Sequence, residues 1–219
     1  MVHYQRKFWL LAISLSALAG FVDAIGFIKL GGLFVSFMTG NSTRMAVEWA
    51  TAPAVALSAL KLITSFVLGV MIGTLIRSAA GRHPKPAVLA FVALSLGLAA
   101  GVDAIMATDA PNGWTVALLA LAMGGANAVF QRNGEVSIGV TYMTGTLVKL
   151  GQRLVSALQG GDRWQWLPYL LLWAGFIAGA ATGALAHAAM GSISLLPAAG
   201  FAALLALLAI FAPENTALR

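Results

Sequence analysis

Two short polar segments of this chain repeat one pattern of hydroxyl, amide and basic side chains. The first, Ser36–Met45, reads SFMTGNSTRM; the second, Thr141–Leu150, reads TYMTGTLVKL and begins 105 residues later. Glycine permits backbone angles that other residues avoid, and nearby hydroxyl or amide side chains can cap a helix that begins there. The free N–H groups of such a helix start suit an anion or another electron-rich solute.

Paired polar interruptions at matching points of two halves indicate the central site of a membrane transporter. A basic residue four positions beyond each glycine would set the charge preference. Asp23, and Asn127 at the matching position of the second half, would couple or gate transport. The predicted solute-binding residues are Thr39, Gly40, Asn41, Arg44, Thr144, Gly145, Thr146 and Lys149.

A plainer interpretation of the same residues stays open. Each segment could be a surface loop that caps a span, with Arg44 and Lys149 at the lipid headgroups. Asp23 would then be an interfacial carboxylate at a helix end, which is also the role that we expect for Asp103 near the end of the third span. Charged residues inside spans are costly and usually functional, so the depth of Asp23 decides between the two interpretations.

The composition places both segments in an integral membrane protein. The chain has 219 residues, of which 60% are hydrophobic and 9% charged, and its mean hydropathy is +0.89. Soluble domains carry about 25% charged residues. The net charge of +6 is expected to come from loops, and no nucleic-acid-binding pattern is visible. The three histidines are scattered, cysteine is absent and no catalytic motif occurs, so we expect no enzyme activity, no cofactor and no metal site.

A spanning helix needs about 20 mostly apolar residues. We expect an all-α membrane protein with six transmembrane helices and two glycine-broken, re-entrant segments. If both segments crossed the membrane there would be eight spans, and the basic loop 77–86 would move outside. The predicted spans are 8–27, 55–76, 87–107, 114–130, 166–189 and 193–211.

The single membrane domain, 1–219, divides into two structural repeats at 8–107 and 114–211. Each repeat reads span, polar segment, span, span, and the end of the leading span aligns Asp23 with Asn127. Three spans per repeat predict opposite orientations, so the polar segments would enter from opposite faces and meet near the midplane. Glycines four residues apart in the second and fifth spans predict close helix approach, either inside the chain or in a homodimer.

Loop charges predict the orientation, because cytoplasmic loops carry extra Lys and Arg. The N-terminus, loop 77–86, segment 131–165 and the C-terminus with Arg219 are rich in these residues, whereas 107–113 has none. We therefore expect both termini in the cytoplasm.

The polar segments and their surroundings resemble a known family. Residues 21–24 (FVDA), 31–41 (GGLFVSFMTGN) and 141–146 (TYMTGT) are similar to the bacterial YoaK-like family, also called domain of unknown function 1275. The resemblance covers nearly the whole chain. It implies a bacterial multi-spanning membrane protein, which we therefore expect in the inner membrane, and it implies no substrate or catalytic residue.

The repeat therefore carries the functional hypothesis. We expect a small transporter whose partners are the bilayer and a small polar or anionic solute bound between the paired Met-Thr-Gly motifs. A passive channel would show flux without ion coupling, and a scaffold or sensor would show none.

Overall fold

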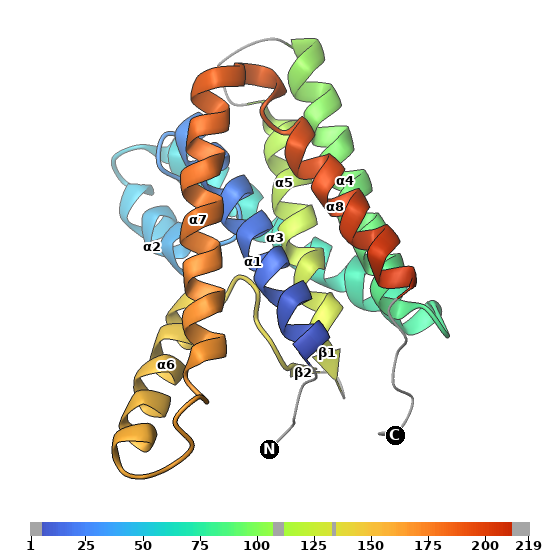
Figure 1. Cartoon of the computed structure of the whole chain (residues 1–219). Helices are drawn as coiled ribbons and strands as arrows, with labels where there is room; N and C mark the ends of the chain where they lie inside the picture. The colour runs from blue at the N-terminus through green and yellow to red at the C-terminus, as the bar shows by residue number, and fades with distance from the viewer. Residues whose placement is uncertain (1–5, 107–111, 133–134, 212–219) are drawn as a thin grey trace.

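The computed structural model describes residues 6–106, 112–132 and 135–211, and these residues are largely helical (Figure 1). Residues 107–111 of the expected outer loop 107–113 and the ends of both termini, including Arg219, lie outside the described residues. Two 3₁₀ helices, η1 (Asn127–Phe130) and η2 (Gly191–Ile193), and a hairpin of β1 (Gln131–Arg132) and β2 (Glu135–Val136) link the longer elements. The α-helices are α1 (Arg6–Lys29), α2 (Met38–Glu48), α3 (Pro53–Ala79), α4 (Pro84–Met106), α5 (Gly113–Ala126), α6 (Met143–Leu158), α7 (Leu167–Met190) and α8 (Leu196–Ile210).

Five helical segments of the described chain are long and apolar enough to cross a membrane. They are α1, α3, α4, α5 continued by η1, and α7 continued by η2. Proline stands in the first turn of α3 and α7, where its missing N–H has no helical partner to lose. The structure thus agrees with an all-helical integral membrane protein, and these five match the first five expected spans within a few residues.

The sixth expected span, 193–211, begins later and is shorter than predicted. Gly191 has a φ of 56°, which ends α7, and Pro197 fixes the first turn of α8. At 1.5 Å per residue the 15 residues of α8 extend about 22 Å, against a hydrocarbon core of about 30 Å. A full-length sixth span therefore stays a prediction. The helices of the polar segments are also short, 11 residues in α2 and 16 in α6, which disfavours the eight-span alternative.

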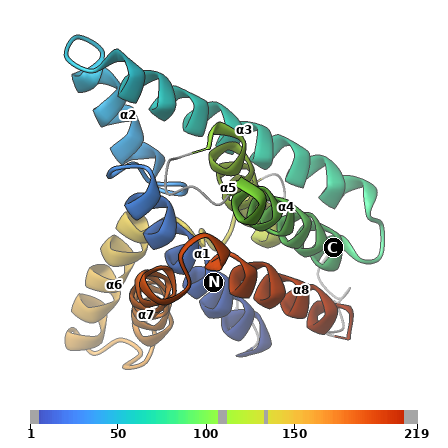
Figure 2. The same ribbon diagram turned by 90° about the horizontal axis from the view of Figure 1, so that it is seen from above.

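Helices α1 and α7 cross at glycines (Figure 2). A Cβ atom added to Gly20 would meet the backbone carbonyl of Phe176, and one added to Gly179 would meet the carbonyl of Ala17. The two backbones are therefore in direct contact. Such contact supplies dispersion energy in lipid, where no hydrophobic effect drives helices together.

A second crossing joins α3 and α5 in the same manner. A Cβ atom at Gly124 would meet the carbonyl of Phe66, and one at Gly69 would meet the carbonyl of Leu121. Sequence reasoning correctly predicted close approach at the glycines of the second and fifth spans. The structure shows their partners, which are the leading helices of the opposite halves of the chain.

Helices α4 and α8 complete the bundle and pack against each other. Figure 1 shows α4 and α8 running in opposite directions, and it shows the same for α1 and α5. Helix α4 also packs closely along α5, whereas α8 makes only slight contact with α1. The buried face of each helix carries an apolar residue at every fourth position. These residues are Val88, Val92 and Leu96 in α4 and Ala198, Ala202 and Ala206 in α8.

Candidate functional site

Each polar motif begins a short helix, and the glycine of each motif lies inside that helix. Gly40 is in the first turn of α2 and Gly145 in the first turn of α6. The prediction that these glycines break the chain is therefore wrong. Positive φ angles occur earlier in the chain, at Gly31 (60°) and Gly32 (90°), where the chain leaves α1.

The expected caps also differ from the structure. The N-cap residues are Phe37 and Tyr142, and neither makes a side-chain capping hydrogen bond. The motif hydroxyls leave the first backbone N–H groups of both helices uncapped, so the physical role proposed for them from sequence was wrong. What fixes each helix start is a tertiary contact to the helix before it.

Asp23 holds the segment that leads into α2. One carboxylate oxygen, Oδ1, accepts hydrogen bonds from the N–H groups of Val35 and Ser36, both at 2.8 Å, and Oδ2 accepts one from the Ser36 hydroxyl at 2.6 Å. Asp23 is buried and precedes the end of α1 by six residues, which places it about 9 Å below that end. The chain therefore turns at its glycines and re-enters the bundle, and Asp23 is a buried acceptor for this segment rather than an exposed carboxylate at the helix end.

Asn127 makes the corresponding contact in the second half. Its Oδ1 accepts a hydrogen bond from the Thr141 hydroxyl at 3.1 Å, and its Nδ2 donates to the carbonyl of Met123 at 3.0 Å. Asn127 and Thr141 are both buried. The chain leaves α5 through η1 and the β1–β2 hairpin and returns to Thr141 before α6 begins. In both halves a side chain near the end of the leading helix binds a hydroxyl residue just before the motif.

Asn41 is engaged inside the protein. Its Oδ1 accepts from the N–H of Phe34 at 3.0 Å, and its Nδ2 donates to the carbonyl of the same residue at 2.5 Å. Thr146, its counterpart in the second motif, is buried as well. Both residues were predicted to contact solute, but the polar atoms of Asn41 are satisfied by the backbone of the re-entrant segment.

The two basic candidates lie away from the motif glycines. Arg44 donates from Nη1 to the carbonyl of Gly31 at 2.9 Å, and its Nη2 is 3.7 Å from Oε1 of Glu48. Lys149 is exposed on α6 and makes no hydrogen bond or ion pair with any described residue. Neither one pairs with Asp23.

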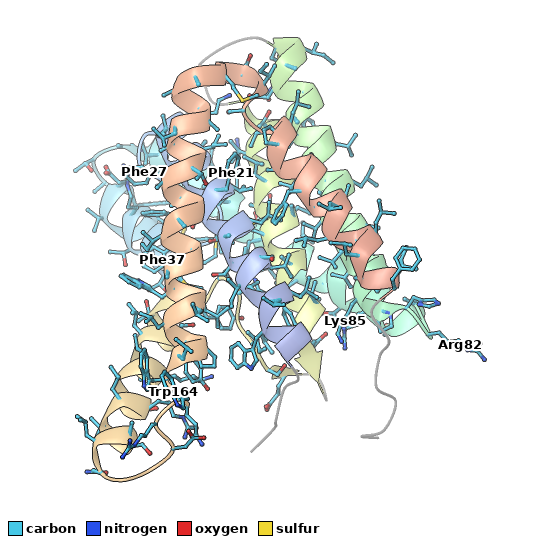
Figure 3. The ribbon with its side chains drawn as sticks, in the orientation of Figure 1. Phe21, Phe27, Phe37, Arg82, Lys85 and Trp164 are labelled. Atoms are coloured by element: carbon cyan, nitrogen blue, oxygen red, sulfur yellow. The ribbon has the colours of Figure 1, made fainter. Side chains whose placement is uncertain are left out.

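The starts of α2 and α6 meet at one cavity of about 460 Å³. In the view of Figure 3, Phe37 lies between α2 and the start of α6. Three predicted site residues line this cavity, namely Thr39, Thr144 and Gly145, while Gly40, Asn41, Arg44, Thr146 and Lys149 do not. The complete lining is Ser36, Phe37, Met38, Thr39, Phe66, Thr141, Tyr142, Met143, Thr144 and Gly145.

Two features of the structure were not found from sequence. Phe66 of α3 contributes to the cavity, and nothing in its spacing indicates this. Lys29 and Asp103 form a buried ion pair, with Nζ 2.5 Å from both carboxylate oxygens. Asp103 was expected to be an interfacial carboxylate near the end of the third span; it lies in the last turn of α4 and is buried against Lys29, whose ammonium group offsets its charge. No group of three or more His, Cys, Asp or Glu able to hold a metal ion occurs in the described part of the chain.

Asp23→Ala is expected to loosen the re-entrant segment. The substitution removes the acceptor of three hydrogen bonds and leaves the N–H groups of Val35 and Ser36 buried without partners. Hydrogen bonds to a charged group each contribute about 1.5–3 kcal/mol. We expect faster amide hydrogen exchange across residues 33–41 and unchanged exchange in α4, measured by mass spectrometry on detergent-solubilised protein.

Asp162→Ala is the matched control for that variant. Asp162 is exposed and accepts hydrogen bonds from Trp164 and Gln165 in the loop before α7. It should leave exchange at residues 33–41 as in the unmodified protein. Equal exchange there in Asp23→Ala would show that the carboxylate does not hold the segment.

Comparison with known proteins gives two relatives that are both named transmembrane proteins. The chain is 35% identical over 190 residues to a protein of Rhizobium meliloti (strain 1021) named "UPF0700 transmembrane protein RA0705", which covers 84% of this chain and 78% of the relative. It is 30% identical over 139 residues to "UPF0700 transmembrane protein YoaK" of Bacillus subtilis (strain 168), which covers 60% of each chain. No solved structure matches the chain.

The family comparison covers nearly all of the helical bundle. Residues 11–208 match the family described as "Protein of unknown function (DUF1275)", from the second turn of α1 to the last turn of α8. This range includes Asp23, Asn127 and both motif helices, and it confirms the resemblance drawn from the motifs. The chain therefore belongs to the DUF1275 family, whose relatives named above are transmembrane proteins.

Proposed function

We propose that this protein is a small membrane transporter whose solute binds between the starts of α2 and α6. One observation carries the proposal: two polar motifs 105 residues apart in the sequence line a single cavity beside α3. Non-helical backbone at membrane depth is tolerated only where it is buried in protein or lines a wet cavity. The segments before α2 and α6 fit this description, because Asp23 and Asn127 hold them within the bundle.

The two halves act as inverted repeats in this proposal. Three observations support it. The leading helices α1 and α5 run in opposite directions. Each leading helix crosses the second long helix of the other half at glycines, α1 with α7 and α5 with α3, and the anchors Asp23 and Asn127 occupy matching positions. Each motif helix would then start near the midplane and extend toward a different side of the membrane.

Unequal packing favours a transporter over a passive pore. In inverted repeats the α4–α5 pair corresponds to the α8–α1 pair, yet α4 packs closely on α5 and α8 hardly touches α1. An apolar cavity of about 210 Å³ lies beside that loose contact, lined by residues that include Phe21, Gly179 and Phe201. Two different packings of equivalent helices are what alternating access requires, because the second state would exchange them. Asp23 and Asn127 would gate by holding or releasing the motif segments.

The orientation in this proposal follows the loop charges. Arg82 and Lys85 lie at the end of the bundle where α1 begins (Figure 3). By the positive-inside rule, this end would face the cytoplasm, and both termini would lie on the cytoplasmic side of a bacterial inner membrane. The first motif would open to the outside and the second to the cytoplasm.

Single-cysteine labelling tests this arrangement, because the chain has no native cysteine. Cysteines at Ser42 of α2, Val148 of α6, Ala80 and Asn112 would be labelled in intact cells with a membrane-impermeant thiol reagent. We expect labelling at positions 42 and 112 from outside, and at 80 and 148 only after permeabilisation. Labelling of both motif positions from the same side would contradict inverted repeats and the shared central site.

A further inference from the structure

The cavity between α2 and α6 is built without a charged side chain. From this we infer, resting on the transport function proposed above, that the solute is an uncharged small molecule with both a polar oxygen group and an apolar part. Every residue that lines the cavity is hydroxyl-bearing, aromatic, thioether-bearing or glycine. The volume of about 460 Å³ lies within the range of about 300–1,000 Å³ that is usual for small-molecule pockets.

The charges near the cavity are already balanced or lie elsewhere. Arg44 is bound to Gly31 and Glu48, and Lys149 projects from the exposed face of α6. The carboxylate of Asp23 accepts three hydrogen bonds from the segment before α2. An ion that entered this cavity would find no side chain of opposite charge, and the partial charges at the two helix starts would offset its lost hydration less than a full counter-charge does. A neutral solute avoids this cost.

The polar groups that remain are suited to an oxygen atom of such a solute. Among the described residues, the side-chain hydroxyls of Thr39, Thr144 and Tyr142 have no hydrogen-bond partner. The first helical backbone bonds are donated by Asn41 and Thr146. The Met38 N–H is bound to the carbonyl of Ser36 at 3.2 Å, so in the first turns the N–H groups without a helical partner include those of Thr39, Gly40, Thr144 and Gly145. These N–H groups donate to carbonyl, ether or hydroxyl oxygens. The positive ends of two helix dipoles at one cavity also oppose the entry of cations.

The remaining lining provides surface for a hydrocarbon part. Phe37 and Tyr142 occupy matching positions in the two motifs, and Met38 and Met143 follow them. Phe37 and Tyr142 are 41% and 50% exposed, and both line the cavity. Thioether side chains adapt to irregular apolar shapes. A solute with only polar groups would leave this half of the cavity unmatched.

Flux into proteoliposomes tests the solute class. The purified protein would be reconstituted, and entry of radiolabelled glycerol, erythritol and 1,2,6-hexanetriol would be compared with entry of formate, lactate and phosphate. We expect at least one neutral solute to enter about tenfold faster than into protein-free liposomes, which corresponds to about 1.4 kcal/mol in the barrier, and no acceleration of the anions. Among the neutral solutes, hexanetriol should gain the most.

Gly145→Leu tests whether the same flux passes through the cavity. Nothing lies within 4 Å of a Cβ atom added at Gly145, so a leucine fits there and fills the cavity without distorting α6. We expect neutral-solute flux to fall about tenfold. Gly151→Leu is the matched control, because Gly151 lies on the same helix with equal space and does not line the cavity.

The outcomes separate the two proposals. Accelerated entry of an anion that Gly145→Leu blocks would overturn the neutral-solute inference and leave the transport site standing. Flux of none of the six probes, in protein that passes the cysteine test, would overturn the transport function itself. Neutral flux unaffected by Gly145→Leu would show that the cavity is not the route.

Discussion

Gly179→Ala is expected to destabilise the protein, although alanine is the better helix former. In an exposed helix this exchange gains about 1 kcal/mol from helix propensity. At Gly179 the added Cβ would collide with the backbone carbonyl of Ala17, which cannot rotate away as a side chain can. Overpacking costs about 1–3 kcal/mol where the neighbours can adjust, and here α1 and α7 must separate. We therefore expect a net loss of about 1–3 kcal/mol, and for Gly179→Leu a failure to obtain folded protein.

Thermal unfolding in detergent, followed by tryptophan fluorescence, measures this effect. Gly69→Ala, at the α3–α5 crossing, should show a similar loss, because the carbonyl of Leu121 stands where that of Ala17 stands at the first crossing. Gly97→Ala is the control. It lies in α4 with nothing within 4 Å of an added Cβ, so it should be neutral or slightly stabilising. Equal midpoints for Gly179→Ala and Gly97→Ala would contradict the close crossing.

The sequence was informative about these glycines only up to a point. Spacing of four residues predicts a helix face that another backbone can approach, and this face was confirmed at Gly69 and Gly179. The identity of the approaching helix depends on contacts more than 50 residues away in the chain. Local pattern carries no such information, so packing inside the chain and packing in a homodimer looked alike from sequence.

The meeting of the two motifs was predictable from sequence, and their local geometry was not. The duplicated motif indicated where the two helix starts would lie, and Thr39, Thr144 and Gly145 line the cavity between them. Glycine at the centre of each motif suggested a chain break, yet Gly40 and Gly145 are helical. The reason is tertiary: Asp23 fixes the backbone at Val35 and Ser36, so the turn is complete before the motif begins.

The charged residues show the same limit. Asp23 and Asp103 both occur as Val-Asp-Ala-Ile, and the sequence offers no reason to assign them different partners. Asp23 binds a neighbouring segment of its own half, whereas Asp103 binds Lys29, which lies 74 residues away. Burial of a carboxylate demands a partner, but the choice between backbone donors and an ammonium group is made by the fold.

Lys29→Met is expected to destabilise the protein strongly, because it breaks a buried ion pair. The side chains of Lys29 and Asp103 are only 6% and 4% exposed, so the substitution leaves a carboxylate buried without its counter-charge. Breaking a buried pair in this way costs about 3–5 kcal/mol. Asp103→Asn should cost less, because the lysine at the end of α1 can extend its ammonium group toward the interface. Chemical unfolding in detergent micelles measures both.

The double variant Lys29→Met with Asp103→Leu distinguishes the cost of leaving one buried charge unpaired from the contribution of the ion pair itself. Two apolar side chains of similar size remove the buried charge together, so stability should return to within about 1 kcal/mol of the unmodified protein or exceed it. Arg44 and Glu48 serve as the exposed control pair, at 3.7 Å with side chains 33% and 27% exposed. Glu48→Gln should change stability by less than about 1 kcal/mol. If Lys29→Met changed the stability as little as Glu48→Gln, Asp103 would be hydrated in the folded protein. The ion pair would then not join the C-terminal ends of α1 and α4.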